Sequence, residues 1–194
     1  MKKNSSPKST TGYTPPQDIL EKYANVLVNF ALNLGKGIKK GDVVRVSSNE
    51  SAKPLYNAVC NAIVKSGGHV IAHYAPDEEQ GDMRRNESHA RFFYQNASDD
   101  QIKFFPKNYL KGLVDDMDHS LFILADKDPH ALDGVNPKRI MMRGQALKPF
   151  MDWRNEKQHK GKLSWTIGMY GTPGMATEAG LSEKAYWDQS IKAC

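Results

Sequence analysis

Two short apolar runs separated by a helical pattern constrain the fold of this chain more than any other feature. The first run, Val43 to Val46, is typical of a buried strand, and the second, His69 to His73, directly follows the pair Gly67 and Gly68. Apolar side chains recur between the runs at the spacing of one helical face, through Leu55, Val59, Ala62 and Ile63. Strand, helix and strand in this order predict two parallel strands joined by a right-handed crossover.

Two further apolar runs extend this pattern into a sheet. Residues Ser120 to Leu124 are uniformly apolar after the serine, as expected for a strand with helices on both faces, and Leu163 to Met169 predict a fourth strand. We expect Phe122 and Trp165 to be buried in neighbouring strands, so that Phe122→Ala costs about 3–5 kcal/mol. The fold class that follows is α/β, a three-layer domain with a mostly parallel sheet flanked by helices.

Capping signals place the helices between these strands. Thr14 to Gln17 form a capping box at the start of a helix that continues to about Leu34, and Ser98 to Gln101 form another. The segment 128–162 predicts a turn and then one long basic helix, and two short helices are expected from about Gly174 onward.

The start of the chain has a different composition. Residues 1–16 are rich in Ser, Thr, Lys and Pro and predict a disordered tail, and residues 17–194 predict one α/β domain. No apolar stretch follows the early lysines as a secretory signal requires, and no apolar run approaches the roughly 20 residues of a membrane span. The expected location is therefore the cytoplasm, with no membrane partner.

The formal net charge of +5 raises the question of a nucleic-acid partner. The basic residues are interleaved with acidic ones and form no stripe with alternating aromatics, so solvated surface charge explains them and no nucleic-acid partner is expected. The two cysteines, Cys60 and Cys194, could form a disulfide, but Cys60 lies in an apolar helical pattern that favours a buried structural thiol.

The usual motifs of catalytic and cofactor sites are missing. Gly35 and Gly37 precede the first strand instead of following it, so they are helix stops and not a dinucleotide loop. His69 and His73 are four residues apart in a strand, which separates them by roughly 13 Å and prevents them from chelating one ion. The remaining histidines are isolated, and we assign no catalytic, cofactor-binding or metal-binding residue in this chain.

Ligands of such sheets usually bind at the carboxyl ends of the strands. These ends are Ser47 to Glu50, His73 to Asp77, Ala125 to Asp128 and Tyr170 to Pro173. The last of them allows two interpretations: the Tyr170 to Pro173 loop lines a ligand crevice, or Trp165 fills the core while Thr172 and Pro173 cap the next helix.

Several segments of the chain are informative when they are read as an ordered set: 20–24, 27–29, 38–44, 54–55, 68–70, 132–139, 165–179 and 192–194. Together they resemble the aminopeptidase T type of thermophilic metallo-aminopeptidase, over nearly all residues from 17 to 194. In two places the family pattern is not kept: Gly171 stands where the family usually has proline, and an aromatic residue expected near Met175 is missing.

The resemblance implies an enzyme that removes amino-terminal residues from peptides with two divalent metal ions, zinc or cobalt. In the family the Glu, His, Tyr and Asp ligands lie in a later domain, which nothing in this chain matches. This chain then resembles the amino-terminal domain, inactive alone, and would meet a peptide substrate through the missing domain. Alternatives are a stand-alone binding or dimerisation module without activity and a small nucleotide-binding α/β protein, and a homodimer stays open.

Overall fold

The computed structural model describes residues 13–77 and 89–193. The predicted tail up to residue 12 lies outside the described residues, as does Cys194, the other half of the Cys60–Cys194 disulfide considered above. At the start of the described chain, Pro15 is buried and the Tyr13 N–H donates to Glu183 over 2.6 Å. No helix in the described part of the chain is long and apolar enough to cross a membrane.

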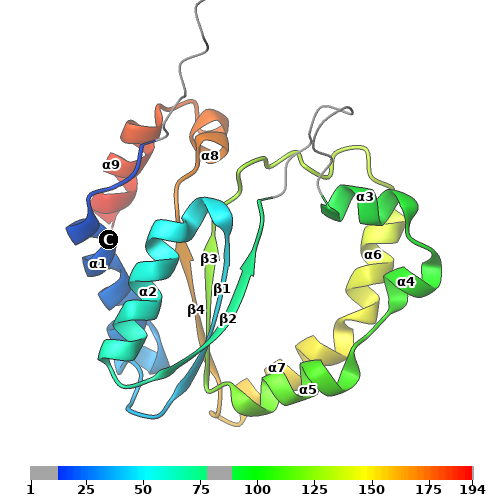
Figure 1. Ribbon diagram of the computed structural model, residues 1–194, viewed down its shortest axis with the longest axis horizontal. Coiled ribbons are helices and arrows are strands. Elements are labelled where there is room, and N and C mark those ends of the chain that lie inside the picture. Colours follow the sequence, from blue (N-terminus) through cyan, green and yellow to red (C-terminus); the bar gives the residue numbers. More distant parts are fainter. Residues whose placement is uncertain (1–12, 78–88, 194) are drawn as a thin grey trace, which may run out of the picture.

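Four parallel strands form one sheet in the order β2-β1-β3-β4 (Figure 1). The predicted strand–helix–strand unit is its first half, and each strand begins within one residue of the expected position. The strands are β1 (Val43–Asn49), β2 (His69–Ala75), β3 (His119–Leu124) and β4 (Ser164–Met169).

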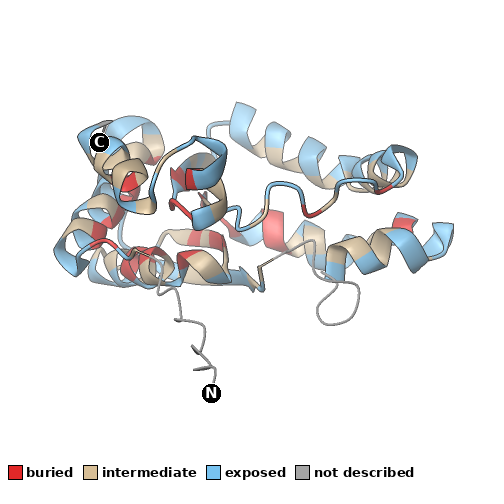
Figure 2. Ribbon diagram, turned by 90° about the horizontal axis from the view of Figure 1, so that it is seen from above, coloured by how far each residue is buried: buried red, intermediate tan, exposed pale blue. Residues whose placement is uncertain are grey.

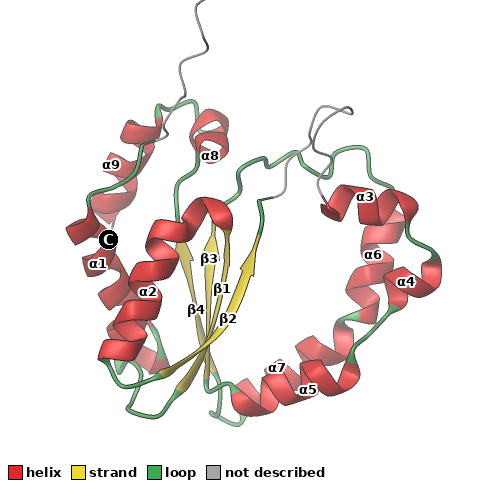
Figure 3. Ribbon diagram, viewed as in Figure 1, coloured by secondary structure: helices red, strands yellow, loops and turns green. Residues whose placement is uncertain are grey.

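Helices lie on both sides of the sheet, which confirms the three-layer α/β class (Figure 3). Short 3-10 turns at Asn33–Gly35 and Glu50–Ala52 and a π turn at Leu27–Ala31 supplement them. The α-helices of the described residues are α1 (Gln17–Val26), α2 (Lys53–Lys65), α3 (His89–Asn96), α4 (Asp99–Lys103), α5 (Lys107–Asp116), α6 (Pro137–Ala146), α7 (Lys148–His159), α8 (Pro173–Glu178) and α9 (Glu183–Ala193).

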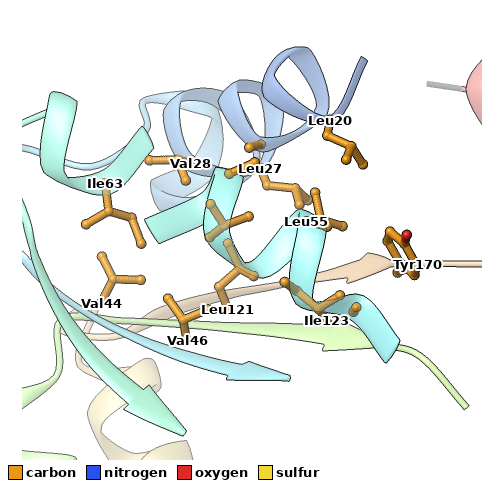
Figure 4. Packing of buried hydrophobic residues seen from close by; sticks show 14 of the residues in the cluster. Leu20, Leu27, Val28, Val44, Val46, Leu55, Ile63, Leu121, Ile123 and Tyr170 are labelled. Carbon is orange, nitrogen blue, oxygen red and sulfur yellow. The ribbon is translucent and has the colours of Figure 1, made fainter. Parts of the chain in front are cut away.

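The main core lies between one face of the sheet and helices α1 and α2 (Figure 4). Side chains alternate along each strand, so Val44 and Val46 of β1 share this face with Leu121 and Ile123 of β3, and all four are fully buried. Gly168 of β4 is required here, because an added Cβ would lie 2.7 Å from a methyl carbon of Leu27.

The opposite face of the sheet is only partly covered, and here the prediction for two core residues is wrong. Phe122 and Trp165 do lie on adjacent strands, since Ser120 pairs with Trp165, but their exposed fractions are 40% and 49%. The reason is that α5 and α7 pack near the amino ends of the strands (Figure 1). Together with α3, α4 and α6 they form a helical arm that extends away from the sheet. We call the partly covered side the open face.

The predicted long basic helix of residues 128–162 is two helices, α6 and α7, which meet at Leu147. Pro149 lies in the first turn of α7 and has no N–H to continue the helical hydrogen bonds, which explains the break. The basic residues of these helices join the arm together: Arg143 donates to the carbonyls of Ile102 and Phe104, and Lys157 donates to three carbonyls at the end of α5.

Of the two predicted capping boxes, one is confirmed. The Ser98 hydroxyl accepts the Gln101 N–H, and the Gln101 side chain accepts the Ser98 N–H over 2.7 Å. Thr14 does not cap α1, whose N-cap is Pro16 without a side-chain hydrogen bond. The Thr14 side chain instead hydrogen-bonds Tyr170, beside the buried Pro15.

Candidate functional site

The carboxyl ends of the strands meet at one edge, as parallel pairing requires, but their polar groups are used within the protein. Asp77, after β2, accepts the Ser51 N–H over 2.9 Å and the Ser51 hydroxyl over 2.7 Å, and its carboxylate is 3.8 Å from Lys127 Nζ. These contacts tie the ends of β1, β2 and β3 together.

The Tyr170 to Pro173 loop follows the structural interpretation in one respect, the helix cap, and departs from it in the other, the position of Trp165. Thr172 caps α8 by accepting the Met175 N–H, and it also donates to the Asp126 carbonyl. Tyr170 packs edge-on against Trp187, with ring centroids 4.9 Å apart. Trp165, in contrast, does not fill the core but lies half-exposed on the open face.

Hydrogen bonds to carboxylates account for the position of His130, one of the isolated histidines. His130 contacts Asp133 through Nδ1 at 2.9 Å and Glu178 through Nε2 at 3.1 Å, so the two carboxylates lie at opposite nitrogens of the ring and do not converge on one point. Both carboxylates raise the pKa of His130, Glu178 most strongly. His69 and His73 both lie in β2, as predicted. Within residues 13–77 and 89–193, no three His, Cys, Asp or Glu side chains are grouped as a metal site requires.

A hollow of about 960 Å³ at the amino ends of the strands contains a Ser–His–Asp chain. His119 Nε2 is 2.9 Å from Asp42 Oδ2, and its Nδ1 is 2.8 Å from Ser164 Oγ. Ser164 Oγ also accepts the Asn33 N–H over 2.9 Å, and His119 is only 6% exposed. Each group has its partners within the protein, so the chain of hydrogen bonds anchors the starts of β1, β3 and β4 to one another.

The open face carries a groove, and in the part of the chain that the structure describes two buried polar atoms in and beside it lack hydrogen-bond partners. The groove has a volume of about 370 Å³ and lies between α7 and strands β3 and β4. Its α7 wall is one helical face, Met151, Arg154, Asn155 and Gln158, and its floor is Ser120, Phe122, Leu163, Trp165, Thr166 and Ile167.

Two arginines set the electrostatics of this groove. Arg45 pairs with Ser120 across β1 and β3, which places it beside the groove floor. Burial lowers the pKa of Arg45, and the positive charge of Arg154 lowers it further. Burial also lowers the pKa of Arg154. Neither guanidinium forms an ion pair with any residue that the structure describes.

Two buried polar atoms accompany these charges. Ser47 Oγ and Arg154 Nε are buried without a hydrogen-bond partner among the described residues. Sequence reasoning missed this site, although Arg45 interrupting the apolar run of β1 was its signal. The arrangement suits an anion that also carries an apolar group, because guanidinium groups bind carboxylates through paired hydrogen bonds.

Comparisons with known proteins bear on the fold and on the family of this chain. No curated protein sequence matches it. The solved structure of wild-type AmpT from Thermus thermophilus superposes with a TM-score of 0.66 at 20% sequence identity, covering 91% of this chain and 42% of AmpT. This likeness confirms the fold, and the chain spans less than half the length of that protein. The family model for thermophilic metalloproteases, M29, matches residues 16–194. Since that match takes in the whole sheet and every described helix, the chain belongs to the M29 family of thermophilic metalloproteases.

Proposed function

We propose that this chain is the amino-terminal α/β domain of a metal-dependent aminopeptidase, which removes amino-terminal residues from peptides. The observation that carries the proposal is the M29 family match over residues 16–194. In this proposal the domain supports and shapes the enzyme, and a separate domain provides the metal centre and the hydrolytic step.

The described residues do not fit a two-metal centre. Such a centre needs several carboxylate and imidazole ligands that converge within a few ångströms. His119 is enclosed by Asp42 and Ser164, and His130 has its two carboxylates on opposite sides of the ring. We therefore assign no catalytic step to this chain, and the identity of the metals, zinc or cobalt, stays a prediction from the family.

A peptidase assay tests the proposal. The purified 194-residue chain should release no amino acid from an aminoacyl reporter with added zinc or cobalt, whereas a longer chain, if the coding sequence continues, should do so with metal. His69→Ala and His73→Ala in the 194-residue chain are the matched controls for a metal site on the sheet. Metal-dependent turnover by the 194-residue chain, abolished by either change, would overturn the proposal.

The second candidate is a stand-alone binding or dimerisation module. The open face favours it, because a groove with unpaired charge is suited to a partner. A longer chain that stays inactive with either metal would favour the module over the peptidase domain. The cytoplasmic location and the homodimer stay predictions, which cell fractionation and sedimentation analysis would check.

A further inference from the structure

We propose that the groove on the open face binds the carboxyl-terminal end of a peptide, with the carboxylate held by Arg45 and Arg154 and the last side chain on the apolar floor. The choice of a peptide as the occupant rests on the proposed function. The rest of the argument rests on the charges, hydrogen bonds and shape of the groove.

The charge of the groove calls for an anion. No acidic residue is among its lining residues, while Arg154 lies in its wall and Arg45 beside its floor. A partly buried charge is costly unless a partner compensates it, and two like charges near each other add to that cost. A carboxylate between the two guanidinium groups would compensate both.

The unsatisfied hydrogen-bonding atoms lie on the same side of the sheet. Ser47 and Arg45 are two residues apart on β1 and so point to the same face, and Ser47 pairs with Phe122 of the groove floor. Ser47 Oγ and Arg154 Nε have no partner among the described residues, although nearly all buried polar groups in proteins have one. Two buried polar atoms without a partner among the described residues therefore accompany the arginines on this side of the sheet.

The rest of the groove is apolar and aromatic. Phe122, Trp165 and Ile167 are 40%, 49% and 55% exposed, which is unusual for neighbouring large side chains on a central sheet. The volume of about 370 Å³ lies at the lower end of the range of ligand sites, which is enough for one or two amino-acid residues. The two arginines and the apolar floor together suit a peptide whose last residue has a free carboxylate and a large apolar side chain.

A comparison of peptide binding with binding of the peptide amide separates the contribution of the carboxylate from that of the apolar contact. The probes are the tripeptide Ala-Leu-Phe with a free carboxyl terminus and the same tripeptide as its amide, titrated into the full 194-residue chain by calorimetry. We expect the free acid to bind about tenfold or more tightly than the amide, because the charged hydrogen bonds are lost in the amide. Trp165 fluorescence should change on binding of the acid, and Trp165→Phe should remove this signal.

Substitutions identify the residues. Arg45→Met and Arg154→Met should each weaken binding of the free acid by about tenfold or more and leave the amide unaffected. Both should change the melting temperature only slightly, because each removes a charge without an ion pair among the described residues. Arg154→Met also removes the contacts of the guanidinium with Phe150 and Met151. Lys148→Met removes one charge from an exposed site on the same helix and should change neither property.

Several outcomes would overturn the proposal. Equal binding of acid and amide would leave only an apolar surface, and no binding of either at millimolar concentration would leave no peptide site. Self-association that Arg154→Met abolishes, without peptide binding, would assign the face to a second copy of the chain. The peptidase activity of a longer chain tests only the proposed function, because the binding experiments on the 194-residue chain do not depend on turnover.

Discussion

Alternation along β3 places neighbouring residues in opposite environments. Leu121 is fully buried under α1 and α2, whereas Phe122 lies 40% exposed on the open face. Size and hydrophobicity alone favour Phe122 as the core residue, yet the sheet gives that place to the smaller leucine.

Alanine substitutions on β3 should show this difference. Leu121→Ala should cost about 2–5 kcal/mol of unfolding free energy, because it leaves a cavity in the core. Phe122→Ala should cost only about 1–2 kcal/mol, since part of its surface is already in water. Urea unfolding of both variants measures the two values. A larger loss for Phe122→Ala would mean that the open face is covered in solution.

The imidazole of His119 joins three strands through Asp42 and Ser164. His119→Ala should cost about 2–3 kcal/mol, because it removes the hydrogen bonds with Asp42 and Ser164 from a buried position. His159→Ala, at the exposed end of α7, is the matched control and should stay within about 0.5 kcal/mol of the parent. Equal effects in thermal unfolding would show that the network contributes nothing.

Among the elements, the helical arm is joined by basic side chains that donate to backbone carbonyls as well as by a small apolar cluster. Lys157 of α7 donates to the carbonyls of Val114, Asp115 and Met117, each over 2.8 Å, and so caps the end of α5. The buried residues of the small cluster beside it are Val114, Met117 and Leu163.

Removal of this cap should loosen the arm. Lys157→Met should cost about 2 kcal/mol, because three carbonyls lose a charged donor. Lys160→Met, which removes only an exposed pair with Glu156, should cost less than about 1 kcal/mol. Hydrogen exchange at the end of α5 reports the change directly. The prediction fails if Lys160→Met has the larger effect there.

The contact of His130 with Glu178 links the loop after β3 to α8 and depends on pH. Hydrogen bonds that His130 donates to the carboxylates of Glu178, with the larger effect, and Asp133 raise the pKa of His130 in the folded protein. Because the pKa is raised on folding, the stabilisation from the protonated imidazole is fully present below the ordinary histidine pKa of about 6.5. It is lost as the pH rises through the pKa of the folded protein.

An NMR titration of His130 measures this link. The pKa of His130 should lie above 6.5 in the parent and should fall in Glu178→Gln, which removes the first of its two partners. A His130 pKa at or below 6.5 in the parent would show that the link does not form.

For the molecule as a whole, the core is on one side of the sheet and the arm extends from the other. Buried residues gather around the sheet and helices α1 and α2, while most residues of the arm are of intermediate burial or exposed (Figure 2). Helix α6 has no buried residue, whereas α2 has four. Unequal burial of this kind predicts unequal local stability.

Native-state hydrogen exchange should therefore divide the chain in two. Amides of α6 should exchange through local opening, with little dependence on denaturant, whereas amides of α2 should exchange only through global unfolding. Free tripeptide should slow the exchange of α7 more than that of α2, since α7 forms a wall of the groove. Uniform protection across both regions would contradict this division.

Much of the fold was predictable from local signals. The apolar runs at β1 and β3, the capping box at Ser98 and the glycine pair before β2 gave the strands, one helix start and the parallel order. The first helix was misread at its start because Thr14, which has the right residue type for a cap, bonds Tyr170 instead. The candidate site was not predicted, because Arg45 and Arg154 are 109 positions apart and only the sheet brings them together.

The sequence by itself determined which segments become strands and helices and which family the chain resembles, because those signals lie within a few residues of one another. Only the tertiary structure decided which sheet face is the core. Both Leu121 and Phe122 are apolar, and the choice between them depends on where α1, α2 and α7 pack. The same packing leaves two arginines on the open face without an ion pair among the described residues, because burial and charge pairing are properties of distant segments brought into contact.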